Sequence, residues 1–217
     1  MKAMVLAAGR GERLRPLTDT LPKPLVEVLG KPLIDYHLEA LAAAGIRSVV
    51  INLGWHGDQI ADRVGSGERY GLDVAYSPEG DNILETGGGI FRALPLLGDA
   101  PFLVVNADIY TDIPPPGPLA DDADGHLVLV PRPAFRDRGD FGLENGRVTN
   151  ADAPDYTFSG VAIYRPAFFA GQSPGRFPLA PLLREAADRG RLTGEVWQGS
   201  WEDVGTPERL AALNSPS

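Results

Sequence analysis

The sequence predicts an α/β fold with a mixed, mostly parallel sheet that is flanked by helices. In residues 1–113, short apolar runs alternate with helical patterns, which is typical of consecutive β-α-β units. In residues 114–217, several short strand patterns are separated by turn signals before a helical pattern returns. We therefore expect one domain of 217 residues, in which a β-rich second half adds to, or covers, the first half.

The first half is predicted to contain strands and helices in strict alternation. The expected strands are 3–8, 48–53, 72–77 and 101–106. The expected helices are 32–45, 57–64 and 87–97. Parallel strands joined by helices bind ligands outside the carboxyl ends of the strands, so we expect the functional site at that edge.

The second half begins with a proline-rich segment at 114–118 and an acidic stretch at 121–124, which we interpret as a surface connection. Strands are expected at 126–130, 141–143, 147–149, 156–164 and 193–198, and helices at 178–190 and 206–213. Glu144-Asn145-Gly146 is a strong hairpin signal between two of these strands.

Composition narrows the range of functions. The chain has no cysteine, which excludes disulfides and thiolate metal sites. Its formal net charge of −9 argues against broad binding of nucleic acids or anionic membranes. We find neither a charged-then-apolar leader nor an apolar stretch long enough to cross a bilayer, so we expect a cytoplasmic protein.

The first 25 residues carry the clearest functional signal. The apolar run ending at Ala8 leads directly into Gly9-Arg10-Gly11, where bare backbone N–H groups can accept a phosphate. From Gly9 to Pro24 the basic residues outnumber Glu12 and Asp19, against the trend of the whole chain, and they are Arg10, Arg13, Arg15 and Lys23. The segment therefore predicts an anionic ligand.

Lysine usage singles out Lys23, because the chain has lysines only at positions 2, 23 and 31. Pro22 and Pro24 hold the backbone of Lys23 extended and direct its side chain. Two other glycine motifs do not fit. A dinucleotide fingerprint would need a third glycine where Leu14 stands, and the Gly-Lys-Ser/Thr of a Walker loop does not occur.

The segment from Leu6 to Pro24 resembles the opening L-x-G-G-x-G-T-R-L-x-P-L-T…P-K-P of the sugar-1-phosphate nucleotidyltransferases. Ala8 replaces the first glycine of that pattern, and Glu12 replaces the threonine. The resemblance implies the Rossmann-like fold of the nucleotide-diphospho-sugar transferases. It also implies that the nucleotide is bound by residues Leu6, Ala8, Gly9 and Gly11.

The resemblance assigns catalysis to two cations. Arg13 would hold the β- and γ-phosphates of a nucleoside triphosphate, and Lys23 would bridge its α-phosphate and the incoming sugar phosphate. The attacking phosphate oxygen is already anionic, so the reaction needs positioning and charge neutralisation rather than a strong general base.

Two aspartates are candidate metal ligands. Asp108 follows the strand at 101–106, and Asp203 stands in Trp201-Glu202-Asp203-Val204-Gly205-Thr206-Pro207. An isolated N-x-D such as Asn106-Ala107-Asp108 more often caps a helix or turn, whereas hard carboxylate oxygens next to phosphates suit Mg²⁺. Resemblance to the V-x-N-x-D and W-x-D-x-G-T-P motifs implies that Asp108 and Asp203 hold Mg²⁺.

The glycines of Leu84-Glu85-Thr86-Gly87-Gly88-Gly89 precede an expected helix. They could form a flexible helix entrance, or they could let a base lie against bare backbone. The segment resembles the L-G-T-A/G-G/H-A element of the family, which implies that Thr86 and Gly87 contact the nucleobase. Glu85 departs from the usual glycine.

The sugar-binding residues are predicted from weaker signals. Many family members carry a Glu-Lys-Pro segment whose lysine helps to bind the sugar phosphate, but this chain has no lysine after Lys31. We expect arginines to replace that lysine. Phe141-Gly142-Leu143 resembles the aromatic-glycine element over the sugar, so Gly142, with Asn150 or Asp152, is predicted to touch the sugar.

The whole chain resembles most closely the N-acetylmuramate α-1-phosphate uridylyltransferases of bacterial cell-wall recycling. That resemblance implies UTP and N-acetylmuramate α-1-phosphate as substrates, and UDP-N-acetylmuramate and pyrophosphate as products. The alternatives are a mannose-1-phosphate guanylyltransferase or another hexose-1-phosphate nucleotidyltransferase, a nucleotide-sugar-sensing regulatory subunit, and a non-enzymatic scaffold. A monomer is the expectation for a chain of this length without an assembly domain.

Overall fold

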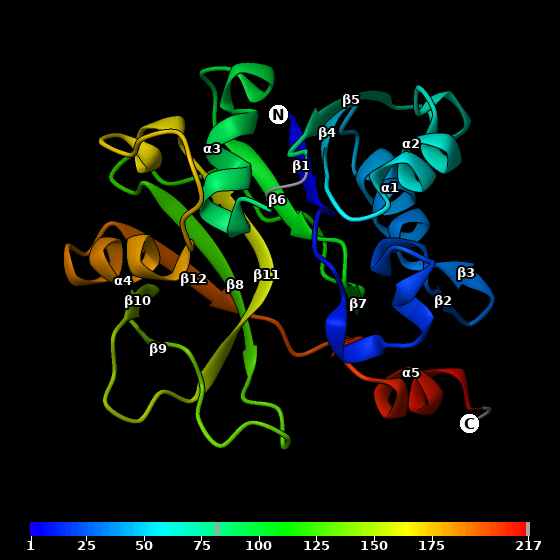
Figure 1. Cartoon of the computed structure of the whole chain (residues 1–217). Coiled ribbons are helices and arrows are strands. Elements are labelled where there is room, and N and C mark those ends of the chain that lie inside the picture. Colours follow the sequence, from blue (N-terminus) through cyan, green and yellow to red (C-terminus); the bar gives the residue numbers. More distant parts are fainter. Residues whose placement is uncertain (81–82, 216–217) are drawn as a thin grey trace.

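The computed structural model describes residues 1–80 and 83–215, and its centre is one nine-stranded sheet (Figure 1). In spatial order the strands are β5 (Asp73–Pro78), β4 (Ser48–Leu53), β1 (Ala3–Leu6), β6 (Phe102–Asn106), β11 (Tyr156–Tyr164), β8 (Gly125–Pro131), β12 (Leu192–Val196), β10 (Arg147–Thr149) and β9 (Gly142–Glu144). The second half of the chain therefore extends the sheet of the first half.

The two halves of the sheet differ in strand direction. From β5 to β6 all neighbours are parallel, as expected for strands that helices connect. From β6 onward the pairs are antiparallel, except for the parallel pair β8–β12. The predicted mixed sheet is thus confirmed, and three of its four parallel pairs belong to the first half of the chain.

Helices cover both faces of the sheet. On one face, α1 (Leu33–Ala43) and α2 (Gly57–Val64) pack against a buried cluster that includes Ala3 and Val5. On the other face, α3 (Glu85–Leu97) and α4 (Ala180–Asp188) pack against a cluster that includes Met4. Successive side chains of β1 therefore enter opposite cores, as the period of a strand requires.

Short elements that the sequence analysis did not predict complete the fold. Two small antiparallel sheets are formed by β2 (Glu27–Val28) with β3 (Lys31–Pro32), and by β7 (Ile109–Thr111) with β13 (Trp201–Asp203). The 3-10 helices are η1 (Glu12–Leu14), η2 (Leu17–Asp19), η3 (Lys23–Leu25), η4 (Glu68–Tyr70) and η5 (Pro166–Phe169).

The last helix, α5 (Pro207–Asn214), begins where the sequence predicts, because Thr206 accepts a hydrogen bond from the backbone N–H of Arg209 and Pro207 occupies the first turn. This C-terminal helix packs beside β2, which belongs to the N-terminal part of the chain. In the described residues, no helix combines the length and apolarity that a membrane span requires.

Candidate active site

A cavity of about 900 Å³ opens at the carboxyl ends of the parallel strands. Strand register creates it, because Leu6 at the end of β1 is aligned with Asn52 of β4 and with Asn106 of β6. Other residues of its wall come from the segment after β1, from the start of α3 and from the second half of the chain. The wall comprises residues Leu6, Ala7, Ala8, Gly9, Arg10, Gly11, Glu12, Arg13, Lys23, Pro24, Asn52, Glu79, Ile83, Glu85, Thr86, Asn106, Asp108, Arg176 and Gly205.

The turn after β1 needs its glycines for different reasons. Gly11 has a φ of +63°, and a Cβ there would lie 2.9 Å from Thr18 and 3.1 Å from the Lys23 side chain. The Thr18 hydroxyl donates a hydrogen bond of 2.8 Å to the Gly11 carbonyl, which folds the following segment back toward the turn. A Cβ at Gly9 would meet nothing within 4 Å, so its bare backbone is open to a ligand.

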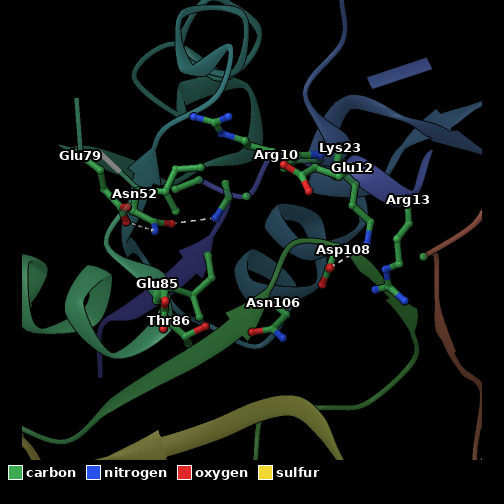
Figure 2. Close-up of a pocket in the computed structure, with 18 of the residues that line it drawn as sticks. Arg10, Glu12, Arg13, Lys23, Asn52, Glu79, Glu85, Thr86, Asn106 and Asp108 are labelled. Carbon is green, nitrogen blue, oxygen red and sulfur yellow. Dashed lines mark hydrogen bonds and ion pairs between the residues drawn. The ribbon is translucent and has the colours of Figure 1, made fainter. Parts of the chain in front are cut away.

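One side of the cavity is formed by Arg13, Lys23 and Asp108, and we call these residues together with the adjoining Asp203 the lysine end. The Lys23 ammonium donates a 2.7 Å hydrogen bond to Asp108 and lies 3.7 Å from an oxygen of Asp203. Its side chain is only 8% exposed, so the charge is held in place by these carboxylates rather than by bulk water. Figure 2 shows Lys23 reaching toward Asp108, with Arg13 beside them.

Asp203 reaches the lysine end through the short pair β7–β13. In that pair, Asp203 lies opposite Ile109, and Ile109 directly follows Asp108 in the chain. The backbone N–H of Val204 also donates to the carbonyl of Asp108 at 3.2 Å. Two carboxylates that are 95 residues apart in the chain numbering are thereby brought to one ammonium group.

The carboxylate of Asp203 is shared by several cations. It lies 3.7 Å from Arg13 and accepts a 2.9 Å hydrogen bond from Arg209 of α5. The Arg209 guanidinium in turn lies 3.5 Å from the ring centre of Phe135. Arg13 and Arg209 contact one carboxylate oxygen of Asp203, and Lys23 lies near the other, so both oxygens face cations.

The oxygen donors of the lysine end fit a magnesium ion. Asp108 and Asp203 already hold one cationic group, the Lys23 ammonium, between them. Mg²⁺ is typically bound by one or two protein carboxylates together with substrate phosphates and water. Within 1–80 and 83–215 no cluster of three or more His, Cys, Asp or Glu residues could hold a metal, so phosphate and water oxygens would have to complete the coordination.

His37 of α1 supports the strand behind the lysine end. Its Nε2 lies 2.9 Å from the carbonyl oxygen of Ile109, in a fully buried position. Burial lowers the pKa of His37 from 6.5 to about 4, although the bond to Ile109 and the charge of Asp108 act in the opposite direction. The imidazole is therefore neutral at pH 7 and donates its Nε2 proton to this carbonyl.

The opposite side of the cavity, which we call the glutamate end, consists of Asn52, Glu79, Glu85 and Arg176. The Asn52 amide donates a 2.7 Å hydrogen bond to Glu79, while its oxygen accepts one of 2.7 Å from the backbone N–H of Ala7. The second oxygen of Glu79 accepts from the backbone N–H of Leu84, also at 2.7 Å. Figure 2 shows this network across the cavity from Lys23.

The network at the glutamate end joins four parts of the fold. It connects the turn after β1, the ends of β4 and β5, and the entrance of α3. Asn52 and Glu79 are both buried, and satisfied hydrogen bonds are what makes burial of such groups tolerable. Asn52 and Glu79 are therefore held in fixed positions by this network.

The glycines of α3 make room for another segment of the protein. A Cβ at Gly87 would lie 2.5 Å from Phe177, and one at Gly88 would lie 2.2 Å from the carbonyl oxygen of Gly175. Gly87 is buried and does not line the cavity, whereas Thr86 does. Thus Gly87, predicted to contact a nucleobase, has a packing role in this structure, and its contact with a base stays a prediction.

The residues predicted to touch the sugar do not line the cavity. Gly142 packs in the β9–β10 pair, where a Cβ would lie 2.6 Å from the Thr149 hydroxyl. The Asn150 amide donates to the Arg184 carbonyl and to Asp188, at 2.8 and 2.7 Å, so it connects β10 to α4. The structure gives both residues structural contacts, and their contact with a sugar stays a prediction.

The structure brings most of the predicted residues to one place. Those that line the cavity are Leu6, Ala8, Gly9, Gly11, Arg13, Lys23, Thr86 and Asp108, and Asp203 joins them through Lys23. The sequence analysis missed Asn52, Glu79 and Arg176 as cavity residues. Asn52 and Glu79 could have been found, because each is a polar residue at or just after the end of an expected strand of the parallel sheet.

Known proteins resemble this chain along its whole length. The family model of the nucleotidyl transferases matches residues 2–126. An N-acetylmuramate α-1-phosphate uridylyltransferase of Neisseria meningitidis is 50% identical, over 97% of this chain and 95% of the relative. A protein of the same name from Caulobacter vibrioides is 39% identical, over 97% of this chain and 94% of the relative.

The fold is also shared with solved structures. A UDP-glucose pyrophosphorylase in complex with UDP-glucose superposes with a TM-score of 0.77, covering 98% of this chain and 96% of the other. The two sequences are 21% identical, so this likeness concerns the fold alone.

Proposed function

Because the chain belongs to the nucleotidyl transferase family, we propose that it transfers the uridylyl group of UTP to N-acetylmuramate α-1-phosphate. The products are UDP-N-acetylmuramate and pyrophosphate, and the reaction serves peptidoglycan recycling in the cytoplasm. The observation that supports catalysis is the buried Lys23 ammonium between Asp108 and Asp203, at the edge of a glycine turn. The two named relatives support the choice of substrates.

The proposed reaction is an in-line displacement at the α-phosphorus of UTP. An oxygen of the sugar phosphate forms a bond to that phosphorus, and the bond to the β-phosphate oxygen breaks. Lys23 would neutralise the two phosphates that meet, which otherwise repel each other. Arg13, with a side chain 63% exposed and beside Asp203, would bind the departing pyrophosphate.

The remaining cavity residues would bind the nucleotide. The open backbone of Gly9 and Gly11, with Leu6 and Ala8, lines the wall where phosphates and base would lie. Thr86 would contact the nucleobase from the start of α3. Asp108 and Asp203 would hold Mg²⁺, which supplies charge neutralisation for the phosphates when bound. We assign residues 1–113 to nucleotide binding and residues 114–217 to sugar binding, in a monomer.

The first experiment measures pyrophosphate release with Mg²⁺ for UTP, GTP, dTTP and ATP, each combined with four sugar phosphates. These are the 1-phosphates of N-acetylmuramate, N-acetylglucosamine, mannose and glucose. We expect the highest kcat/KM for UTP with N-acetylmuramate 1-phosphate. Preference for GTP with mannose 1-phosphate would contradict the proposed substrates, and absence of turnover with every pair would favour the sensing subunit.

The second experiment tests the metal role of Asp203. In Asp203→Asn, the magnesium concentration that gives half-maximal turnover should rise by about tenfold or more, because one anionic ligand is lost. Asp99→Asn is the matched control, since Asp99 is exposed and lies outside the cavity. An unchanged magnesium dependence in Asp203→Asn would refute this ligand assignment.

A further inference from the structure

Arg176 is a cation at the cavity wall that the proposed reaction does not use. Among the described residues, it is the one charged side chain that residues 114–217 contribute to this wall. The other cations of the wall are Arg10, Arg13 and Lys23, all within the first 25 residues. Arg176 therefore stands on the half that we assign to the sugar.

The structure builds the position of Arg176 with specific contacts. The backbone N–H of Phe177 donates to the Leu84 carbonyl at 3.1 Å, and the N–H of Gly88 donates to the Phe177 carbonyl at 3.0 Å. These bonds attach the segment 175–177 to the entrance of α3. They require bare backbone at Gly87 and Gly88, since a Cβ on either would collide with Phe177 or Gly175.

Glu85 orients the Arg176 guanidinium. The Arg176 Nε donates a 2.8 Å hydrogen bond to the Glu85 carboxylate, and both side chains line the cavity. Glu85 has a φ of +59°, a conformation that costs a non-glycine residue energy, so this carboxylate is placed against the local preference of the backbone. The guanidinium has two terminal nitrogens besides Nε, and their N–H groups can bind a carboxylate in a forked geometry.

We propose that Arg176, oriented by Glu85, binds the carboxylate of the lactyl ether of the sugar substrate and so selects N-acetylmuramate over N-acetylglucosamine. This inference rests on the proposed function. The two sugars differ only in this lactyl group, which is anionic at neutral pH. The wall around Arg176 also carries Glu79 and Glu85, so an anionic substituent needs a cation there to be accepted.

The test compares the binding of UDP-N-acetylmuramate and UDP-N-acetylglucosamine by calorimetry. The wild-type protein should bind the first more tightly. In Arg176→Ala this preference should fall by about tenfold or more, and in Arg176→Glu it should reverse. Arg92→Ala is the matched control, because Arg92 is an exposed arginine of α3 outside the cavity and should leave the preference unchanged.

Three outcomes would overturn the inference. The first is a wild-type protein that binds both nucleotide sugars equally. The second is an Arg176→Ala variant with unchanged preference. The third is an equal loss of affinity for both in Arg176→Ala, which would mean that Arg176 binds the shared phosphates. Failure of the proposed function is recognised separately, because wild-type protein would then not turn over UTP with N-acetylmuramate 1-phosphate.

Discussion

The two ends of the cavity are built in different ways. The lysine end uses charged residues that stand in recognisable motifs, and its central cation is buried between two carboxylates. The glutamate end uses polar residues at the ends of β4 and β5, together with a segment that docks on the glycines of α3. The lysine end is therefore held together by charge pairing, whereas the glutamate end is held by neutral–charged hydrogen bonds and close backbone packing.

The largest effect should follow from removing the cation of the lysine end. In Lys23→Ala, kcat should fall by roughly 10³-fold or more, because Asp108 and Asp203 would then face the substrate phosphates without their ammonium partner. Pyrophosphate release measures the effect. Lys31→Ala is the control, since Lys31 pairs with Glu39 outside the cavity. A Lys23→Ala variant with more than a tenth of wild-type kcat would contradict this account.

A second large effect concerns stability and pH. His37 has a folded-state pKa of about 4, below its ordinary 6.5, so the unfolded chain binds a proton that the folded protein excludes. Its contribution to stability is complete above pH 6.5 and is lost as the pH falls toward 4, up to roughly 3 kcal/mol. In His37→Gln, the free energy of unfolding should therefore depend less on pH in this window.

Chemical denaturation of both proteins between pH 7.5 and pH 4 measures this difference. The two proteins share all other titrating groups, so the contributions of those groups cancel when the slopes of unfolding free energy against pH are compared. Identical slopes in the two proteins would show that His37 is not kept neutral by burial behind the lysine end.

A third prediction perturbs the glutamate end alone. In Gly88→Ala the new Cβ would lie 2.2 Å from the Gly175 carbonyl, so the segment 175–177 must shift. We expect a loss of about 1–3 kcal/mol in the free energy of unfolding and a weaker preference for the lactyl sugar. Gly117→Ala is the control, since a Cβ there meets nothing within 4 Å. Equal stability of the two variants would refute the packing role of Gly88.

The smallest effect should come from Arg209, which contacts Asp203 from behind the lysine end. In Arg209→Ala, Asp203 loses a 2.9 Å hydrogen bond but keeps its contacts with Lys23 and Arg13. We expect kcat to fall by less than about tenfold with little change in KM. Arg189→Ala is the control, because Arg189 lies on the surface near the end of α4 and its loss should leave kcat unchanged. A fall as large as that of Lys23→Ala would mean that Arg209 contacts substrate itself.

The residues of the lysine end were singled out from the sequence, whereas Asn52, Glu79 and Arg176 of the glutamate end were not. Buried parallel strands have continuous apolar sequences, and β1, β4 and β6 could be located for this reason. The residues that follow these strands lie at one edge of the sheet. The pairing of β7 with β13 was missed, because three-residue strands leave no periodic pattern. Without that pairing, the approach of Asp203 to Lys23 rested on resemblance alone.

The glycines of α3 show why local sequence could not complete the site. A run of glycines allows a ligand or another segment of the protein to come close to the backbone, but the sequence does not say which of them does so. Here the partner is the segment 175–177, almost 90 residues away in the chain. For the same reason, Arg176 was not recognisable as a cavity residue from the sequence, although a replacement of the missing lysine by arginine was expected.

The most direct test of the central claim follows the phosphorus atom. UTP labelled at its α-phosphorus is incubated with N-acetylmuramate 1-phosphate, Mg²⁺ and the protein, and the labelled products are separated. We predict that the label appears in UDP-N-acetylmuramate with wild-type protein and stays in UTP with Lys23→Ala. Label that appears in UMP, or that stays in UTP with the wild-type protein, would contradict uridylyl transfer at this site.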